Sequence, residues 1–283
     1  MNILITGANG FIGKQLDEYL SQWHLMYSLV RLDPGIPKPR IILLDLSNEE
    51  SIKEGLVAKI FPEKIDVILH CAAQLADSEN YQDMSVFHAN NRITTNVIAL
   101  ASFLKPQKLI NFSTIGVYPN TDGTYTELSY VHPSANRECL YSLSKFCSEE
   151  LFTHFLSPQM DVINLRLSQT LGEGMRKDRI YSIMLTELLE HNTIILFGNG
   201  LRHSSFITID YLKSTVKKML SRPDINGVYN LGEKNMSYRE LAEEIIKKHG
   251  NKDSRILYKE EGIRSKVIID SSKLHEKING DNE

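Results

Sequence analysis

The residue pair with the clearest capacity for chemistry is Tyr141 and Lys145, four positions apart in a chain of 283 residues. This spacing places both side chains on one face of a helix, which we expect over residues 138–156. A tyrosine can pass a proton to or from a hydroxyl or carbonyl oxygen, and a neighbouring ammonium group favours its phenolate form. Chance alone supplies such a pair in a chain with this many tyrosines and lysines, so the pair indicates catalysis only through its position in the fold.

The position of the pair relative to the expected strands supports a catalytic role. The helix precedes an expected strand at 161–167, and Thr114 stands at the carboxyl end of another at 108–113. Ligands of open α/β sheets bind at the carboxyl ends of the strands. Thr114 could therefore orient a substrate oxygen, although its hydroxyl could instead cap its own loop. Together the three residues predict proton transfer coupled to hydride exchange with a nicotinamide cofactor that Tyr141 and Lys145 both contact.

A glycine-rich turn at 6–13 (TGANGFIG) lies between an expected strand at 2–6 and an expected helix at 11–20. Glycines let the backbone approach a pyrophosphate, and the N–H groups at the start of the helix attract an anion. The alternative is a connection that is merely rich in glycine. The strand–turn–helix order favours dinucleotide binding, for which the turn offers Gly7, Asn9, Gly10, Phe11, Ile12 and Gly13.

The end of the second expected strand (26–32) bears on which dinucleotide is bound. An acidic residue there bonds the ribose hydroxyls of NAD, whereas a cation accommodates the 2′-phosphate of NADP. Arg31 lies at the strand tip and Asp33 beyond it, which favours NADP slightly over NAD. Asp45, followed by Leu46, ends the third strand (41–44); it could accept a bond from an adenine amino group or cap a following helix.

Apolar runs of four to six residues alternate with helical patterns along the first part of the chain. This order predicts an α/β fold, a Rossmann-type doubly wound parallel sheet with a smaller C-terminal α/β substrate lobe. We expect residues 1–170 to form the dinucleotide-binding domain and 171–283 the lobe, interleaved with it. The remaining expected elements are strands at 66–70, 194–197, 227–230 and 267–269 and helices at 86–104, 177–190, 210–220 and 237–248.

The overall composition excludes several other classes of protein. A hydrophobic fraction of 42% and a charged fraction of 24% are ordinary for a globular protein, and a net charge of −3 gives no reason to expect nucleic acid as a partner. Cys71, Cys139 and Cys147 lack metal-ligand spacing, so we expect no metal site and reduced thiols. The absence of a signal peptide and of an 18-residue apolar run predicts a cytoplasmic protein without a membrane span.

The chain resembles the extended short-chain dehydrogenase/reductase family, in its nucleotide-sugar epimerase, dehydratase and reductase branch. The resemblance runs from residue 2 to about residue 274. It implies the fold expected above, a nucleotide-sugar substrate, and catalysis by Thr114, Tyr141 and Lys145. The segments that carry it are 2–13, 69–73, 112–118, 141–149, 165–174, 197–200, 206–210 and 228–232.

Further site residues are implied only by this resemblance. Cys71, Ala72 and Ala73 match the fourth-strand segment that lies along the cofactor. Asn91 matches an asparagine that precedes the long central helix, which implies that it also binds the cofactor. Gln169 stands where an asparagine often contacts the sugar nucleotide. Ser204 occupies the place of an arginine that binds the diphosphate in many epimerases. Substitutes for that arginine are Arg202 and Arg264, and ordinary surface charge explains both equally well.

Two departures from the family pattern narrow its implications. Dehydratases of the branch carry an Asp-Glu pair directly after the catalytic threonine, whereas this chain has Ile115 and Gly116, which argues against a dehydratase. The chain also stops soon after Leu274, without the final helix of many relatives, which implies a substrate pocket that is more open or is completed by a partner. Family members often pair through two helices, here 86–104 and 138–156, so a homodimer is expected.

Three functions remain open. The preferred one is a reductase that converts a 4-keto nucleotide sugar with NADPH, because of Arg31 and the compact second lobe. The second is a 4-epimerase that keeps NAD bound. The third is a regulator that senses NADP without turnover, although such proteins generally lose the catalytic tyrosine and this chain keeps it. Products of the branch commonly feed polysaccharide biosynthesis.

Overall fold

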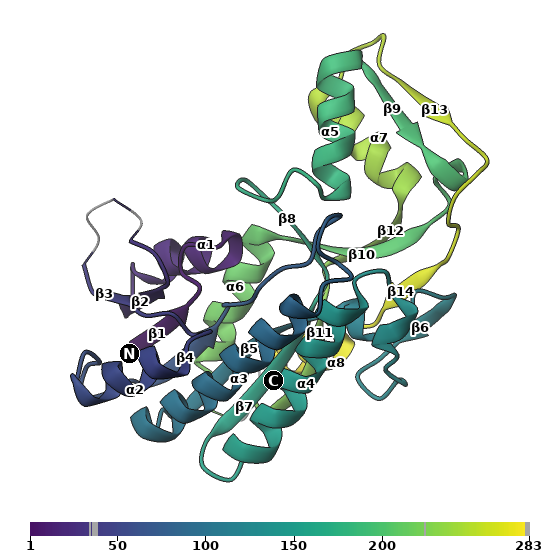
Figure 1. The fold of residues 1–283 in the computed structure, drawn as a ribbon. Coiled ribbons are helices and arrows are strands. Elements are labelled where there is room, and N and C mark those ends of the chain that lie inside the picture. The colour runs from purple at the N-terminus through teal and green to yellow at the C-terminus, as the bar shows by residue number, and fades with distance from the viewer. Residues whose placement is uncertain (34, 36–38, 224, 281–283) are drawn as a thin grey trace.

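The computed structural model describes residues 1–33, 35, 39–223 and 225–280. It consists of a large α/β domain and a smaller lobe that extends from one end of it (Figure 1). The large domain is built on a seven-stranded parallel sheet in the order β11-β7-β5-β4-β1-β2-β3. Its strands are β1 (Asn2–Thr6), β2 (Leu25–Val30), β3 (Ile41–Leu43), β4 (Val67–His70), β5 (Lys108–Thr114), β7 (Asp161–Leu167) and β11 (Gly227–Leu231).

The chain winds outwards in both directions from the centre of this sheet. It runs from β1 through β2 to β3, and then returns to β4 on the other side of β1 before continuing to β5, β7 and β11. The strand order therefore reverses between β1 and β4. In doubly wound sheets ligands bind outside the carboxyl ends of the strands at such a point. The predicted fold class is confirmed.

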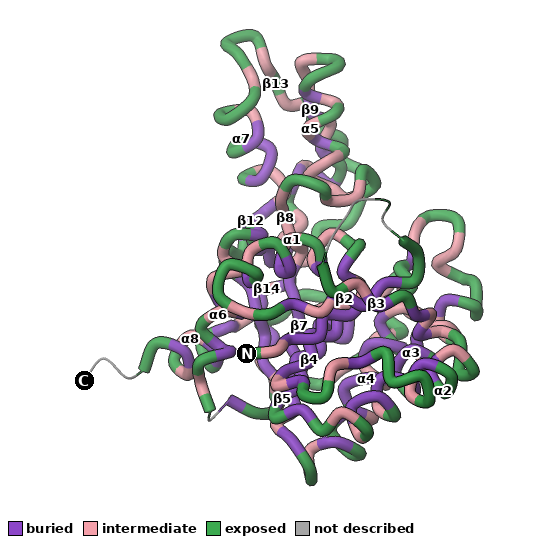
Figure 2. The backbone as a smooth tube through the Cα atoms, turned by 90° about the vertical axis from the view of Figure 1, so that its left-hand side faces the viewer, coloured by how far each residue is buried: buried purple, intermediate pink, exposed green. Residues whose placement is uncertain are grey.

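Helices cover both faces of the large sheet. One face carries α2 (Glu49–Val57), α3 (Met84–Leu104) and α4 (Cys139–Leu156), and the other carries α1 (Phe11–Leu20), α6 (Ile209–Leu220) and α8 (Ser272–Asn279). Alternation along β1 sends Leu4 to the first face and Ile3 and Ile5 to the second. Because both faces are buried, the strands are continuous apolar runs, and the buried residues concentrate there (Figure 2).

The small lobe has a separate core. In it, α5 (Ile180–His191) and α7 (Tyr238–His249) pack against the parallel strands β9 (Thr193–Leu196) and β13 (Arg255–Tyr258). A three-stranded sheet contributes to that core through Phe206 and Met236 and links the lobe to the large domain. Its strands are β8 (Gln169–Leu171), β10 (His203–Thr208) and β12 (Lys234–Ser237). A separate pair of parallel strands consists of β6 (Gly123–Tyr125) and β14 (Val267–Ile269). The short 3₁₀ helices are η1 (Ile115–Val117), η2 (Pro133–Ala135) and η3 (Phe197–Gly200).

Residues after 170 contribute to both parts of the molecule. β11 joins the large sheet by pairing with β7, and α6 packs against α1. The elements not predicted from the sequence are α2, α8 and the short strands β6, β8, β10, β12 and β13. Among the described residues, no helix combines the length and apolarity needed to cross a bilayer.

Candidate active site

A cavity of about 600 Å³ lies at the carboxyl ends of β1, β2, β4, β5 and β7 and continues beneath the start of the small lobe. This volume lies within the usual range of small-molecule sites, roughly 300–1,000 Å³. Its walls include all six predicted residues of the glycine turn, together with Arg31, Asp45, Leu46, Cys71, Ala72, Ala73, Thr114, Tyr141, Lys145 and Gln169. The fold thus brings most of the predicted site residues to one place.

The glycine turn is shaped by backbone contacts that exclude side chains. Gly7 has a φ of +67°, and a Cβ there would lie 2.7 Å from the backbone nitrogen of Ala72. At Gly13 a Cβ would lie 2.2 Å from the carbonyl oxygen of Gly7. Gly10 precedes α1 and offers no side chain to cap it, and Gly10 to Gly13 line the cavity. This arrangement fits a pyrophosphate, because the uncapped N–H groups of a helix start attract an anion.

A methyl group at Gly13 is therefore expected to disrupt this turn. Gly13→Ala forces the backbone of Gly7 to shift, at a cost of about 1–3 kcal/mol. We expect lower thermal stability and at least about tenfold weaker binding of NADPH in a fluorescence titration. Lys14→Ala, on the exposed side of the same helix, is the matched control. Unchanged binding in Gly13→Ala would contradict a pyrophosphate at this turn.

Of the two predicted cofactor-contacting residues at the tip of β2, only one lines the cavity. Arg31 lines the cavity, whereas Asp33 does not; its carboxylate accepts a hydrogen bond from the backbone N–H of Gly35 at 2.9 Å. Asp45 also lines the cavity, and its carboxylate accepts bonds from the N–H and hydroxyl of Ser47. It does not cap α2, because the cap is the side chain of Asn48.

The three predicted catalytic residues share the central part of the cavity. Thr114 and Tyr141 are half-buried, and Lys145 is buried one helical turn after Tyr141. The Thr114 hydroxyl accepts a hydrogen bond from the N–H of Gly116 at 3.0 Å and so caps η1. Because a hydroxyl also carries a proton to donate, Thr114 can cap its loop and still bond an oxygen in the cavity.

Burial determines the protonation of the catalytic pair. It raises the pKa of Tyr141 to about 12, against the opposing charge of Arg179, and Glu138 raises it further. The cations that lower this pKa are Arg179 and Arg176, and not Lys145 as the sequence predicts. Burial also lowers the pKa of Lys145 to about 8, although Cys71 and Glu149 oppose the change. Tyr141 is therefore a protonated phenol at neutral pH.

The lowered pKa of Lys145 predicts an alkaline limit to activity. Lys145 is charged below about pH 8 and neutral above it. We expect kcat/KM, which reports groups of the free enzyme, to fall as the pH rises through about 8. Lys145→Met, tested over the same pH range, should have low activity without this fall. The same alkaline fall in Lys145→Met would contradict the assignment.

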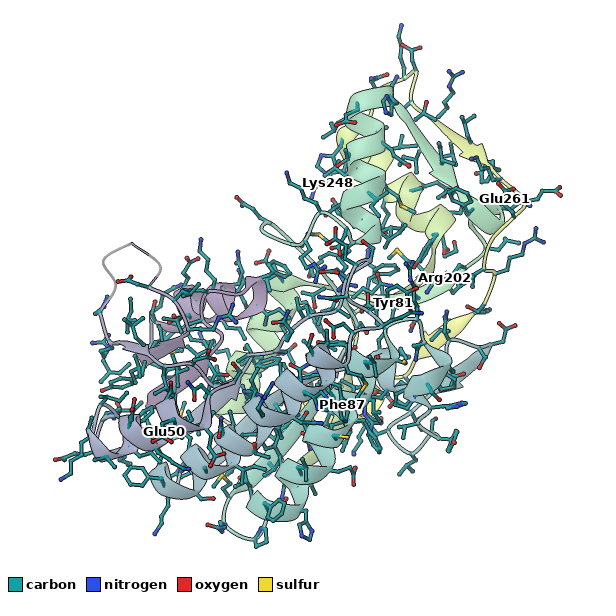
Figure 3. The ribbon with its side chains drawn as sticks, viewed as in Figure 1. Glu50, Tyr81, Phe87, Arg202, Lys248 and Glu261 are labelled. Atoms are coloured by element: carbon teal, nitrogen blue, oxygen red, sulfur yellow. The ribbon has the colours of Figure 1, made fainter. Side chains whose placement is uncertain are left out.

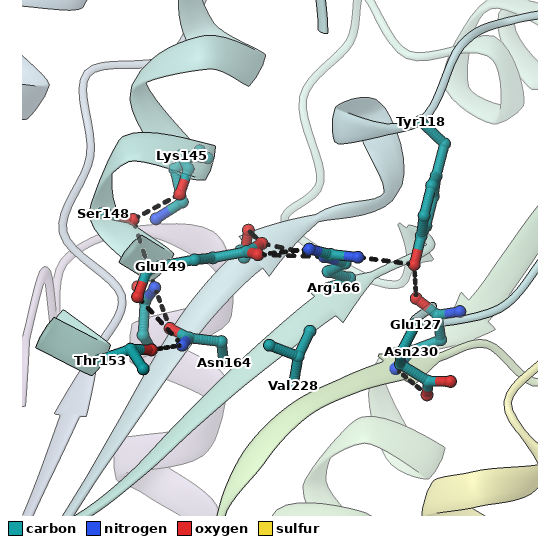
Figure 4. Close-up of polar contacts among 12 residues, drawn as sticks. Tyr118, Glu127, Lys145, Ser148, Glu149, Thr153, Asn164, Arg166, Val228 and Asn230 are labelled. Carbon is teal, nitrogen blue, oxygen red and sulfur yellow. Dashed lines mark hydrogen bonds and ion pairs between the residues drawn. The ribbon is translucent and has the colours of Figure 1, made fainter. Parts of the chain in front are cut away.

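A buried polar network connects α4, the helix that carries Tyr141 and Lys145, to the large sheet (Figure 4). Glu149, one turn after Lys145, accepts hydrogen bonds from Arg166 on β7, the shortest at 2.7 Å, and from the Ser113 hydroxyl. The other end of the Arg166 guanidinium donates to the Tyr118 hydroxyl at 2.9 Å, which lies 2.8 Å from Asn230 on β11. The network joins α4 to three strands of the large sheet.

Asn91 was expected to contact the cofactor, and the structure corrects this prediction. Both Asn90 and Asn91 lie inside α3, and successive residues of a helix differ by about 100° in direction. Asn91 points to an outer groove shared with His88 and Arg92. Asn90 points inwards and joins Gln74, at the cavity wall, to Ser144 on α4.

Two predicted diphosphate ligands also lie outside the cavity. The Arg202 guanidinium stands over the Tyr238 ring at 5.2 Å, at the base of the small lobe (Figure 3). Arg264 is exposed and donates to the carbonyl oxygen of Glu260 at 2.7 Å. Gln169, in contrast, lines the cavity, and its amide donates to the Ser204 hydroxyl at 2.8 Å.

Sequence reasoning missed several polar residues of the cavity wall. They include Gln74, Glu138, Ser168, Arg176 and Arg179. The two arginines belong to the mixed-charge run RKDR at 176–179, at the start of the helix expected at 177–190, and match no motif of the sequence. Among the described residues, no group of three or more His, Cys, Asp or Glu side chains could hold a metal ion.

Comparison with known proteins agrees with this geometry. The chain is 26% identical over 265 residues to a dTDP-D-glucose 4,6-dehydratase of Dictyostelium discoideum, covering 86% of this chain and 61% of that protein. It covers only 41% of a trifunctional UDP-glucose 4,6-dehydratase/UDP-4-keto-6-deoxy-D-glucose 3,5-epimerase/UDP-4-keto-L-rhamnose-reductase of Arabidopsis thaliana, at 25% identity. The chain thus spans less than two thirds of the length of these two relatives.

Solved structures share the fold over nearly the whole chain. A UDP-N-acetylglucosamine 4-epimerase from Methanobrevibacter ruminantium M1 superposes with a TM-score of 0.81 at 20% identity, over 98% of this chain and 91% of that one. A dTDP-glucose 4,6-dehydratase from Bacillus anthracis in complex with NAD gives 0.77 at 22% identity, over 99% and 90%. One family model matches residues 3–232, which are most of this chain. The chain belongs to the NAD dependent epimerase/dehydratase family.

Proposed function

We propose that this protein is an NAD(P)-dependent oxidoreductase acting on a nucleoside-diphosphate sugar, and that it reduces a 4-keto group with NADPH. The observation that carries the proposal is the position of Arg31 on the cavity wall, with Asp33 outside it. A cation at the tip of the second strand suits the 2′-phosphate of NADP. NADPH is a reductant that is consumed, so this preference favours a reductase.

The cavity residues fit the successive parts of a dinucleotide. Arg31 and Asp45 suit the adenosine end, the glycine turn suits the pyrophosphate, and Tyr141 and Lys145 suit the nicotinamide end. When bound, the nicotinamide supplies the hydride. The Bacillus anthracis structure of the same fold is a complex with NAD, which supports a dinucleotide in this cavity.

The protonated state of Tyr141 suits reduction. A keto oxygen that becomes a hydroxyl needs a proton, and a phenol with a pKa of about 12 keeps its proton at neutral pH until the oxygen takes it. The Thr114 hydroxyl can donate a hydrogen bond to the same oxygen and hold it in place. The charges of Arg179 and Arg176, which both lower the pKa of Tyr141, stabilise the phenolate that forms.

The space around Gly116 argues against dehydration, even though relatives of this chain are dehydratases. A Cβ at Gly116 would lie 2.7 Å from the Ser142 hydroxyl oxygen and 3.3 Å from that of Thr114. A side chain after Ile115 would therefore meet the Ser142 hydroxyl and require it to rotate away. The proton-abstracting pair that the resemblance associates with dehydratases is absent from the sequence at these two positions.

A 4-epimerase that retains NAD is the second candidate. The same Thr114, Tyr141 and Lys145 would serve it, because epimerisation oxidises C4 and then returns the hydride to the other face. The similarity in fold to a UDP-N-acetylglucosamine 4-epimerase, with a TM-score of 0.81, is the observation that favours it. Cofactor preference distinguishes the two candidates.

Substitution of Arg31 tests the proposal directly. We expect wild-type protein to bind NADPH at least about tenfold more tightly than NADH, as charge-assisted hydrogen bonds to a phosphate are worth about 1.5–3 kcal/mol. Arg31→Asp should reverse this order in a fluorescence titration. The Asp33 carboxylate accepts a bond from Gly35 and does not line the cavity, so Asp33→Asn should leave the preference for NADPH unchanged. Tighter binding of NADH by the wild type would favour the epimerase.

We also propose that the protein forms a homodimer through α3 and α4. These helices pack side by side on one face of the large sheet and expose large apolar side chains. Those side chains are Met84 and Phe103 on α3 and Leu143 and Phe155 on α4. Light scattering should give twice the mass of the chain, and Phe103→Glu combined with Phe155→Glu should give the monomer mass.

A further inference from the structure

A nucleoside-diphosphate sugar carries two negative charges that the protein must hold near the catalytic centre. Four cationic side chains line the cavity among the described residues: Arg31, Lys145, Arg176 and Arg179. Arg31 lies at the tip of β2, beside the dinucleotide site, and Lys145 is buried beneath the catalytic tyrosine. Arg176 and Arg179 remain, on the segment between β8 and α5 that enters the small lobe.

We propose that Arg176 and Arg179 bind the diphosphate of the substrate, exchanging their present carboxylate partners for it. This inference rests on the proposed function and identifies the residues that hold its substrate. No motif of the sequence marks these two arginines as site residues. The two predicted from the family resemblance, Arg202 and Arg264, lie outside the cavity.

The two arginines bond different segments of the chain around the cavity. Arg176 donates to the carbonyl oxygen of Ala76, in the loop after β4, at 3.1 Å. Arg179 donates to the carboxylate of Glu138, just before α4, at 3.0 Å. One short segment thus contributes two guanidinium groups to the cavity wall. Planar guanidinium groups suit phosphate oxygens, which they can bond in pairs.

The start of α5 adds to the positive potential between these arginines. Arg179 is the N-cap of this twelve-residue helix, and neither its own side chain nor an acidic residue in the first turn bonds the free N–H groups there. The partial positive charge of a helix start favours an anion. Tyr181, in the same first turn, also lines the cavity.

Both arginines are paired in a way that an anion can displace. Arg176 bonds Asp178 at 2.5 Å and Arg179 bonds Glu138 at 3.0 Å, and all four side chains are about one third exposed. Ion pairs with such access to water contribute little to stability. A diphosphate offers more oxygens and more charge than either carboxylate, so the exchange of partners favours the ligand.

Both arginines interact electrostatically with Tyr141 and share one cavity with it. The charges of Arg179 and Arg176 both lower the pKa of Tyr141, so both guanidinium groups lie within electrostatic reach of the phenol. Gln169 and Thr170 line the wall of the same cavity. A diphosphate on the arginines would therefore place the attached sugar next to Tyr141 and Thr114.

Nucleotide binding measured by calorimetry tests the inference without relying on turnover. Full-length protein saturated with NADP⁺ is titrated with UDP, dTDP, GDP and CDP and with the four matching monophosphates. We expect one base to be preferred, and its diphosphate to bind at least tenfold more tightly than its monophosphate. Arg176→Gln and Arg179→Gln should each weaken the diphosphate at least tenfold, while Arg179→Lys, which keeps the charge, should lose less. Arg202→Gln and Arg264→Gln are the matched controls and should bind like the wild type.

The outcomes separate this inference from the proposed function. If the wild type binds none of the nucleotides, the substrate class is wrong and the inference falls with it. If the wild type binds a diphosphate but Arg176→Gln and Arg179→Gln bind it equally well, the inference alone is overturned. Loss of binding in Arg202→Gln instead would move the diphosphate site to the small lobe. Binding of NADP⁺, measured on each variant, should stay unchanged and shows that the variant is folded.

Discussion

Tyr141→Phe is expected to lower kcat by about 10²–10⁴-fold, because a positioned proton donor contributes a factor of this size. The substitution removes one hydroxyl from a half-buried ring, so folding and cofactor binding should persist. The measurement is single-turnover oxidation of bound NADPH by a 4-keto nucleotide sugar, together with a cofactor titration. The titration distinguishes a lost proton from a lost site.

Tyr130→Phe is the matched control for this prediction. Tyr130 is 77% exposed and does not line the cavity, so its hydroxyl should contribute nothing to the rate. If Tyr141→Phe turned over as fast as the wild type, Tyr141 would not be the proton donor. An absence of turnover in the wild type itself, with NADP binding intact, would favour the regulator over the enzyme.

Glu149→Gln is expected to cost about 3–5 kcal/mol of the free energy of unfolding, because it leaves the buried guanidinium of Arg166 without its counter-charge. The side chains of the two residues are 0% and 5% exposed, so water cannot compensate. Chemical denaturation monitored by circular dichroism measures the loss. The paired change Glu149→Leu with Arg166→Met should recover much of the stability, since it removes both charges together.

Lys53→Gln breaks an ion pair with Glu49 on the surface of α2 and serves as the control. It should leave the denaturation midpoint unchanged, because exposed pairs contribute little. A similarly small effect of Glu149→Gln would show that the network in Figure 4 is not a structural anchor for the catalytic helix. The two variants therefore each break one ion pair, which is buried in Glu149→Gln and exposed in Lys53→Gln.

The sequence predicted those parts of the site whose positions depend on residues that are neighbours in the chain. The strand at 2–6 and the helix at 11–20 were placed with the observed bounds, because a turn rich in glycine separates two clear apolar patterns. Thr114 and Tyr141 reach the same cavity for a similar reason: Thr114 ends β5, and Tyr141 lies in the first turn of α4. Parallel pairing then brings such boundaries together at one edge of the sheet.

The phase of a helix was harder to obtain from sequence. Asn90 and Asn91 are the same residue type, and only packing decides which one faces the catalytic helix. The structure selects Asn90, which bonds Ser144 on α4, whereas sequence similarity had suggested Asn91. An error of one residue is a rotation of about 100° on a helix and moves a side chain to another surface.

The short strands and the charged residues of the cavity wall were the features least predictable from the sequence. The strands β8, β10 and β12 are three to six residues long and partly polar, so their pairing depends on contacts far apart in sequence. The sequence placed Arg179 in a helix expected at 177–190 and did not mark it or Arg176 as a cavity residue, which both are. The high pKa of Tyr141 likewise follows from burial, which the spacing from Lys145 does not reveal.

The central claim is that this cavity transfers hydride from NADPH to a keto group of a nucleotide sugar. The most direct test mixes the purified protein with NADPH and a 4-keto-6-deoxy nucleotide sugar and follows the absorbance of the reduced nicotinamide. We predict stoichiometric loss of that absorbance and formation of a deoxy-sugar nucleotide, with neither seen for Tyr141→Phe on the same time scale. Constant absorbance, together with tightly bound NAD and interconversion of a UDP-hexose with its 4-epimer, would contradict the reductase and establish the epimerase.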